Sequence, residues 1–119
     1  MKLKIERIED AGVLEKERIV FSVLANEDVG RYVVFKSKKT GETSVSNKTS
    51  ATFWFPDQSV QRGDLVVLYT KGGSDKSSAT QGGKSSHFFY WGKTSPLWTN
   101  SDDAIVLVNI NSWAFHFPS

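Results

Sequence analysis

Short apolar runs separated by turn-forming residues recur along the whole chain of 119 residues, without the 3.6-residue spacing of an amphipathic helix. The breaks consist of turn-forming residues, as in the segments at 10–12 and 62–64. Many short strands with this spacing favour an all-β fold, an antiparallel sandwich or barrel. The apolar runs predict about seven strands, at residues 2–9, 18–25, 30–37, 50–55, 64–71, 86–91 and 104–110.

Length and composition set the broad class of the protein. A chain of 119 residues with 39% hydrophobic and 24% charged residues fits one globular domain, 1–119, with a single core. The absence of cysteine excludes disulfides, thiolate nucleophiles and cysteine zinc sites. The first residues contain no apolar signal region and no run reaches membrane-spanning length, so we expect a cytoplasmic protein that does not enter a membrane.

The longest break, residues 71–86, is rich in Ser, Gly and Lys and predicts a mobile hairpin loop. Its end, Gly82-Gly83-Lys84-Ser85, resembles part of a phosphate-binding loop, but Ser78 stands where that motif needs its first glycine. A strand follows instead of the helix whose N-terminus would hold phosphate. We therefore reject nucleotide binding at this loop.

Positive charge is concentrated in the middle of the chain. Residues 31–93 hold ten basic and four acidic residues, a local charge of +6, while the whole chain is at +2. Most of the lysines fall in expected loops, which indicates either ordinary solvated loops or a weak surface for polyanions.

Few residues are candidates for catalysis. His87 and His116 are the only histidines, and neither metal-ligand spacing nor a Ser/His/Asp arrangement is visible in the sequence. We expect Asp102 to cap the turn into the last strand, and His87, at a strand start, to be a surface or interface residue. The sequence therefore predicts a protein that is not an enzyme and that has no metal or cofactor.

Three stretches, in order, resemble a known family over roughly residues 5–110. The first is an Ile-x-x-Ile start followed by KERIVFSVLANEDVGRYVV, the second is FWFPDQSVQRGDLVVLYT, and the third is LWTNSDDAIVLVN. The chain thereby resembles the lamin tail domain family of small immunoglobulin-like β-sandwiches. The matching residues are Ile5, Ile8, Glu17, Ile19, Phe21, Asn26, Gly30, Asp102 and Leu107.

This resemblance implies an immunoglobulin-like antiparallel β-sandwich of about seven strands that serves as an interaction or tethering module. Family members share no catalytic residues, and their partners differ. Ser101 stands where the family often has glycine, and the insertion 71–86 with the following HFFYWG has no counterpart in the family pattern.

Several expected strands are apolar on both faces, although a sandwich strand needs only one apolar face. In the segment 86–98, SHFFYWGKTSPLW, either Phe88 and Tyr90 or Phe89 and Trp91 belong to the core. The other face must be covered, because soluble monomers rarely expose large apolar patches.

Three covers are compatible with the sequence. The tail at 111–119, with Trp113, Phe115 and Phe117 as a lid, or a long loop could fold over the second face. A protein partner or a homodimer could bury it, or sugars or unpaired bases of nucleic acid could stack on it, with loop lysines holding phosphates. We expect a non-catalytic interaction module, with a nucleic-acid or carbohydrate binding module as the alternative. The candidate binding residues are His87, Phe89, Tyr90, Trp91, Trp98 and Trp54.

Overall fold

The computed structural model describes residues 1–118 and is built from strands, with two short 3₁₀ turns. Its elements are β1 (Leu3–Glu9), β2 (Arg18–Val23), β3 (Glu27–Asp28), η1 (Val29–Arg31), β4 (Tyr32–Gly41), β5 (Ser44–Val45), β6 (Ala51–Trp54), β7 (Ser59–Val60), β8 (Leu65–Tyr69), β9 (Lys76–Ala79), η2 (Gln81–Gly83), β10 (Ser85–Tyr90) and β11 (Asp103–Asn109). Every run predicted as a strand contains one. The predicted all-β sandwich is confirmed.

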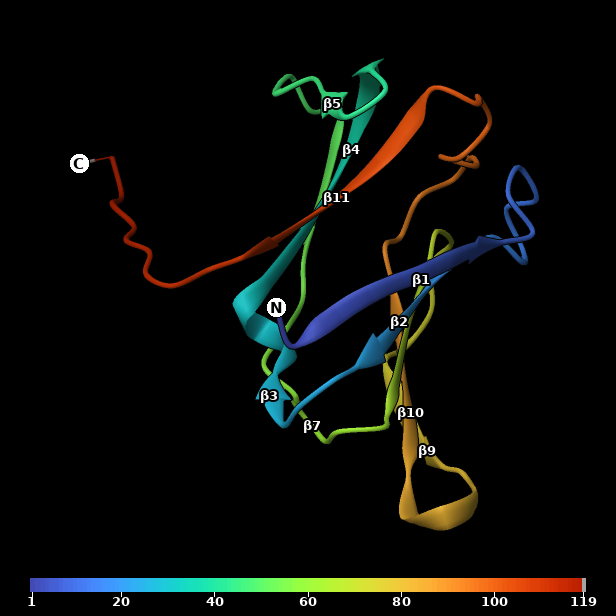
Figure 1. The fold of residues 1–119 in the computed structure, drawn as a ribbon, viewed down its shortest axis with the longest axis vertical. Coiled ribbons are helices and arrows are strands. Elements are labelled where there is room, and N and C mark those ends of the chain that lie inside the picture. Colours follow the sequence, from blue (N-terminus) through green and yellow to red (C-terminus); the bar gives the residue numbers. More distant parts are fainter. Residues whose placement is uncertain (119) are drawn as a thin grey trace.

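Two sheets face each other across the core (Figure 1). The first has the strand order β1-β2-β8-β10-β9. In the second sheet, β4 pairs with β11 on one side and with β6 on the other. The C-terminal end of β4 also pairs with β5. The short pair of β3 and β7 forms a separate two-stranded ribbon.

Aromatic side chains from both sheets fill the space between them. Phe55, which follows β6, makes edge-to-face contacts with Phe21 of β2 at 5.8 Å and with Phe89 of β10 at 5.2 Å between ring centres. All three rings are buried. Edge-to-face aromatic pairs stabilise a protein by more than the burial of their apolar area alone. Many of the aromatic residues of this chain therefore serve to stabilise the core.

One strand pair departs from the antiparallel pattern. β10 lies between β8 and β9, parallel to β8 and antiparallel to β9. The chain therefore passes over β10 before it returns through the β9–β10 hairpin. Gly73 makes this crossing possible, because a Cβ there would lie 2.5 Å from the ring of Tyr90. The segment 71–86, predicted as a loop, thus contains an edge strand and a 3₁₀ turn.

A carboxylate without a cationic partner, Glu17, joins three distant segments just before β2. Its side chain is fully buried. It accepts hydrogen bonds from the amides of Gly12 at 2.7 Å, Leu97 at 2.8 Å and Trp98 at 3.2 Å, and from the Thr70 hydroxyl at 2.5 Å. Burial raises the pKa of Glu17, but these hydrogen bonds outweigh it and the pKa lies below its ordinary value.

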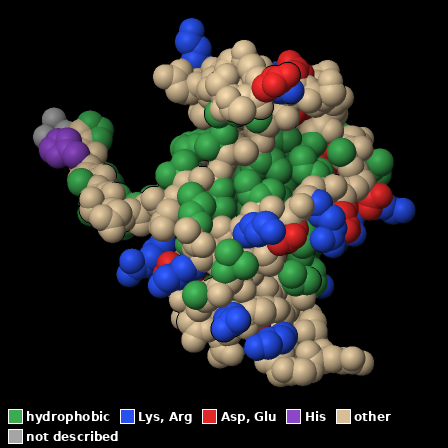
Figure 2. Space-filling view, in the orientation of Figure 1, with side chains coloured by type: hydrophobic (Ala, Val, Ile, Leu, Met, Phe, Trp, Pro, Cys, Tyr) green, Lys and Arg blue, Asp and Glu red, His purple; other side chains and the backbone are tan. Residues whose placement is uncertain are grey.

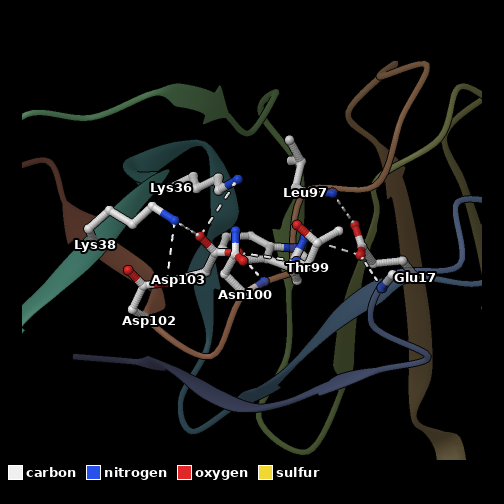
Figure 3. Close-up of polar contacts among 10 residues, drawn as sticks. Glu17, Lys36, Lys38, Leu97, Thr99, Asn100, Asp102 and Asp103 are labelled. Atoms are coloured by element: carbon white, nitrogen blue, oxygen red, sulfur yellow. Dashed lines mark hydrogen bonds and ion pairs between the residues drawn. The ribbon is translucent and has the colours of Figure 1, made fainter.

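Asp103 holds the other end of the segment that leads into β11 (Figure 3). Its Oδ2 accepts the amides of Thr99 at 3.1 Å and Asn100 at 3.0 Å, and its Oδ1 lies 2.7 Å from Lys38 Nζ. Asp103, and not Asp102 as predicted, is therefore the residue whose side chain caps this turn. Asp102 and Asp103 are adjacent in the sequence, which does not show which of them points inward. The register of β11 on β4 turns the side chain of Asp103 inward. Asp102 is exposed and lies 3.5 Å from Lys38.

We predict that Glu17→Leu lowers the free energy of unfolding by about 3 kcal/mol, because it leaves several buried donors without an acceptor. Urea unfolding followed by tryptophan fluorescence measures the change. Glu15→Gln is the matched control, since Glu15 is largely exposed, and we expect a change within about 0.5 kcal/mol for it. Equal effects of the two substitutions would contradict the role assigned to Glu17.

The pKa values of Glu17 and Asp103 also predict a pH dependence. Burial raises the pKa of Asp103. Hydrogen bonds from Lys38 and Asn100 and the charges of Lys36 and Lys38 lower this pKa by more, so that it lies below its ordinary value. Both groups thus have lower pKa values in the folded chain than their ordinary 4.5 and 3.8. Their contribution to stability is complete above those ordinary values and is lost as the pH falls through the lowered ones.

We therefore expect the free energy of unfolding of the wild type to fall when the pH decreases below about 4.5. The stability difference between the wild type and Glu17→Gln should shrink over the same interval, because the variant has no carboxyl group to protonate. Urea titrations at several pH values between 7 and 3 measure both quantities. A difference that stays constant or grows in acid would show that the pKa of Glu17 is not lowered by folding.

Candidate functional site

The aromatic cluster at 86–98 contributes mainly to the core. Three of its candidate binding residues, His87, Phe89 and Trp98, are at most 5% exposed and cannot present a contact surface. Trp91 points inward as well, and its ring lies 5.8 Å from that of Phe53 and 6.5 Å from that of Trp98. Of the two alternatives for this strand, Phe89 and Trp91 therefore face the core.

His87 is buried, so the prediction that it is a surface residue is wrong. Its Nε2 lies 2.9 Å from Asp64 Oδ2, and its Nδ1 lies 2.7 Å from the hydroxyl oxygen of Ser77. Ser77 is directly opposite His87 in the β9–β10 ladder, and Asp64 directly precedes β8. The structure thus contains a serine–histidine–aspartate chain of hydrogen bonds that the sequence spacing did not reveal.

The contacts of Asp64 explain what this chain of hydrogen bonds does in the fold. The carboxylate also accepts the amides of Gln61 at 2.9 Å and Ser85 at 3.0 Å. Burial raises the pKa of Asp64, and the hydrogen bonds from Gln61, His87 and Ser85 lower it below its ordinary value. The ionised carboxylate therefore fastens the turn before β8 to the start of β10.

Tyr90 lies on the outer face of the five-stranded sheet. Its ring stacks on that of Tyr69, with 5.4 Å between centres and 10° between planes. The Lys71 ammonium group lies 5.3 Å and the Arg18 guanidinium 5.8 Å from the centre of the Tyr69 ring. Both rings are half-buried. The second face of β10 is thus covered in part by the neighbouring tyrosine.

Trp54 is the candidate residue with the largest exposed surface, at 47%. It lies on the outer face of the second sheet, level with Val33 of β4, which is in turn level with Val108 of β11. The indole Nε1 donates to the Gly30 carbonyl at 2.8 Å, which fixes the ring in place. The structure thus holds the exposed ring of Trp54 in one orientation at the surface.

Around Trp54 the outer face forms a continuous apolar groove, which we call the outer groove. One hollow of about 600 Å³ opens beside Trp54, and a second of about 360 Å³ extends toward Val45. The two share Phe35 and Val108 in their walls, so they form one surface. The side chains of the sheet that form the outer groove are Val33, Phe35, Val45, Trp54, Val106 and Val108.

The tail, residues 111–118, covers only one end of the outer groove. Trp113 packs edge-to-face on Trp54 with 5.0 Å between ring centres. Phe115 and Phe117 remain 71% and 76% exposed. The tail runs away from both sheets (Figure 1). The lid formed by the chain's own tail is therefore limited to Trp113, and Ser119 lies outside the described residues.

A smaller apolar opening lies on the other side of β11. Figure 2 shows apolar side chains gathered between β11 and β1, the facing edges of the two sheets. Leu3, Ile5 and Leu107 line a hollow of about 350 Å³ there. β11 consequently borders apolar surface on both sides, which explains why its sequence lacks alternation.

Sequence reasoning missed most of the outer groove because it concentrated on the aromatic cluster at 86–98. The available signal was the double-sided apolar pattern of the last strand, AIVLVNI, together with Trp54. Val106 and Val108 alternate with Ile105 and Leu107, which pack against the core. The sequence therefore indicated that β11 has a second apolar face, but it did not indicate that β4 and β6 would lie beside that face.

Chemical sites and relatives give no further guide to function. Among residues 1–118, no group of three or more His, Asp or Glu side chains is placed to hold a metal ion. The same residues include no helix long and apolar enough to cross a membrane. Neither a protein-family model nor a curated protein matches this chain.

We predict that the two faces of β10 differ in their contribution to stability. Phe89→Ala should lower the free energy of unfolding by about 3–5 kcal/mol, because it opens a cavity in the core. Tyr90→Ala should cost about 1–2 kcal/mol, because it removes a half-buried stacked ring. Chemical denaturation of both variants measures the difference, and a larger loss for Tyr90→Ala would reverse the assignment of the two faces.

Proposed function

We propose that the chain is a non-catalytic interaction module that binds protein, either a partner chain or a second copy, through the outer groove. The observation that carries the proposal is the apolar groove beside a half-exposed, hydrogen-bonded Trp54. Aromatic residues with adjoining apolar pockets supply most of the energy in protein interfaces. Monomeric proteins rarely leave a continuous apolar face of this kind in water.

The order of the sheet supports this choice of surface. Val33, Phe35, Val106 and Val108 come from two adjacent strands in fixed register, so the wall of the groove is formed by rigid structure. A preformed apolar wall loses little conformational entropy when a partner binds. The groove therefore offers an apolar partner both area and rigidity.

The resemblance to lamin tail domains agrees with this proposal, since that family consists of interaction and tethering modules. Membership of the family, the absence of catalysis and of a cofactor, and a cytoplasmic location remain predictions. The hydrogen-bonded histidine fits the non-catalytic proposal, because His87 is only 5% exposed and its partner Asp64 joins the turn before β8 to the start of β10.

The second candidate, a nucleic-acid or carbohydrate binding module, would use the stacked Tyr69 and Tyr90. Arg18 and Lys71 lie close to these two rings, but both are already paired with acidic side chains. Arg18 pairs with Glu9 and Asp10, and Lys71 lies 3.7 Å from Glu15. Because these acidic partners neutralise the local charge, phosphate binding would have to displace them. The outer groove therefore remains the favoured surface.

We predict that Val106→Lys weakens the binding of apolar peptides to the folded protein. A peptide library displayed on phage is selected on the wild type, and the affinity of the enriched peptides is measured for the wild type and the variant. A lysine in the groove should weaken binding at least about tenfold, because its charge must be desolvated in the complex. The enriched peptides should be rich in aromatic and aliphatic residues.

Val13→Lys is the matched control, because Val13 is half-exposed in the turn between β1 and β2, outside the outer groove. Circular dichroism of both variants confirms that each is folded. Enriched peptides that bind Val106→Lys as tightly as they bind the wild type would rule out the outer groove as the binding surface.

A further inference from the structure

We propose that the ligand of the outer groove is the tail of a second copy of this chain, and that two copies exchange their tails reciprocally. The inference rests on the function proposed above and names the partner. It is carried by an apolar groove that, within residues 1–118, the tail covers only at the Trp54 end, and by an aromatic segment of the same chain that projects into solvent.

The direction of the tail is set by two contacts at its start. The amide of Ile110 donates to the Arg31 carbonyl at 2.6 Å, and Trp113 packs on Trp54. Between these contacts the chain has only two residues, which leaves little freedom to turn back. The tail consequently leaves the body of the molecule and projects from it as a separate arm in Figure 2.

The tail presents a continuous row of aromatic rings. Ring centres of Trp113 and Phe115 are 6.0 Å apart, and those of Phe115 and Phe117 are 5.4 Å apart. The two phenylalanines remain exposed because the tail carries them away from both sheets. Exposed aromatic rings on a projecting segment gain the full hydrophobic stabilisation only when another surface covers them.

The spacing of the rings matches that of the outer groove. In extended chain, residues two apart lie about 6.6 Å apart on the same side. Phe115 and Phe117 are two residues apart in the sequence, as are Val106 and Val108 on β11 and Val33 and Phe35 on β4. An extended tail laid along these strands would turn both phenylalanines toward the outer groove, whose two hollows share Phe35 and Val108.

The chemistry of both surfaces favours exchange between identical chains. Residues 104–119 contain no Asp, Glu, Lys or Arg, and the groove is lined almost entirely by apolar and small polar side chains. A two-fold axis between two copies would bury both tails with the same contacts, which gives a closed dimer. Because the contact is apolar, its strength should change little with salt.

Disulfide trapping tests the inference directly, since the chain contains no cysteine of its own. Phe117→Cys is mixed with a differently tagged Val45→Cys variant and oxidised. Val45 is 47% exposed at the far hollow, so the folded state should tolerate the change. We expect a mixed disulfide dimer at twice the chain mass of 13.3 kDa. Phe117→Cys mixed with Val13→Cys is the matched control and should give little of this product.

Sedimentation supplies a second measurement that does not depend on cysteine. The wild type should be a dimer whose dissociation constant rises at least about tenfold in the Phe115→Ser, Phe117→Ser double variant. Both side chains are exposed in the single chain, so the variant should fold normally. The dissociation constant of the wild type should be nearly the same at low and high salt.

Three results would overturn the inference. One is a monomeric disulfide in the double variant Val45→Cys, Phe117→Cys, which would show that each tail folds onto its own groove. Another is a wild type that is monomeric yet binds apolar peptides through the outer groove, which would leave the proposed function intact with a different partner. The third is a dimer that keeps its affinity in the double serine variant.

Discussion

The buried carboxylate of Glu17 is the contact on which the placement of the second sheet depends. It lies just before β2 and binds the segment that leads into β11, so the first sheet determines where the last strand of the second sheet begins. A cation would have compensated its charge, but backbone amides and one hydroxyl do so instead. Because such donors are fixed by the fold, the carboxylate favours one conformation over its alternatives.

Carboxylates perform the same task at other connections. Asp28 accepts the amides of Gly30 and Gln58, Asp64 closes the turn before β8, and Asp103 closes the turn before β11. Because these polar contacts hold the connections, the aromatic residues are not needed there and pack in the core and on one outer face. The outer groove is thus a consequence of strands whose ends are held by polar contacts and whose two faces are both apolar.

The sequence was sufficient to predict seven of the eleven strands in residues 1–118, because apolar runs bounded by Gly, Asp and Asn have a local cause. It could not predict which strands become neighbours, so the parallel position of β10 was missed. β9 was missed for a related reason, since the segment KSSA becomes a strand only through pairing with β10. His87 shows the same limit, because its burial depends on Asp64 and Ser77, which come from separate segments. In the run TFWF, alternation separates Trp54 from its neighbours but does not decide which side faces solvent.

The parallel pairing of β8 with β10 has a consequence for how the chain folds. Adjacent parallel strands cannot be joined by a tight hairpin, so β10 reaches β8 only through a crossover, which here contains β9. β11 must also find β4, more than sixty residues earlier in the chain, as in the pairing of Asp103 with Lys38. Topologies dominated by such distant pairings fold in milliseconds to seconds, much more slowly than helical bundles. Until β11 pairs with β4, this strand, which is apolar on both faces, is without the neighbour that shields it in the folded chain.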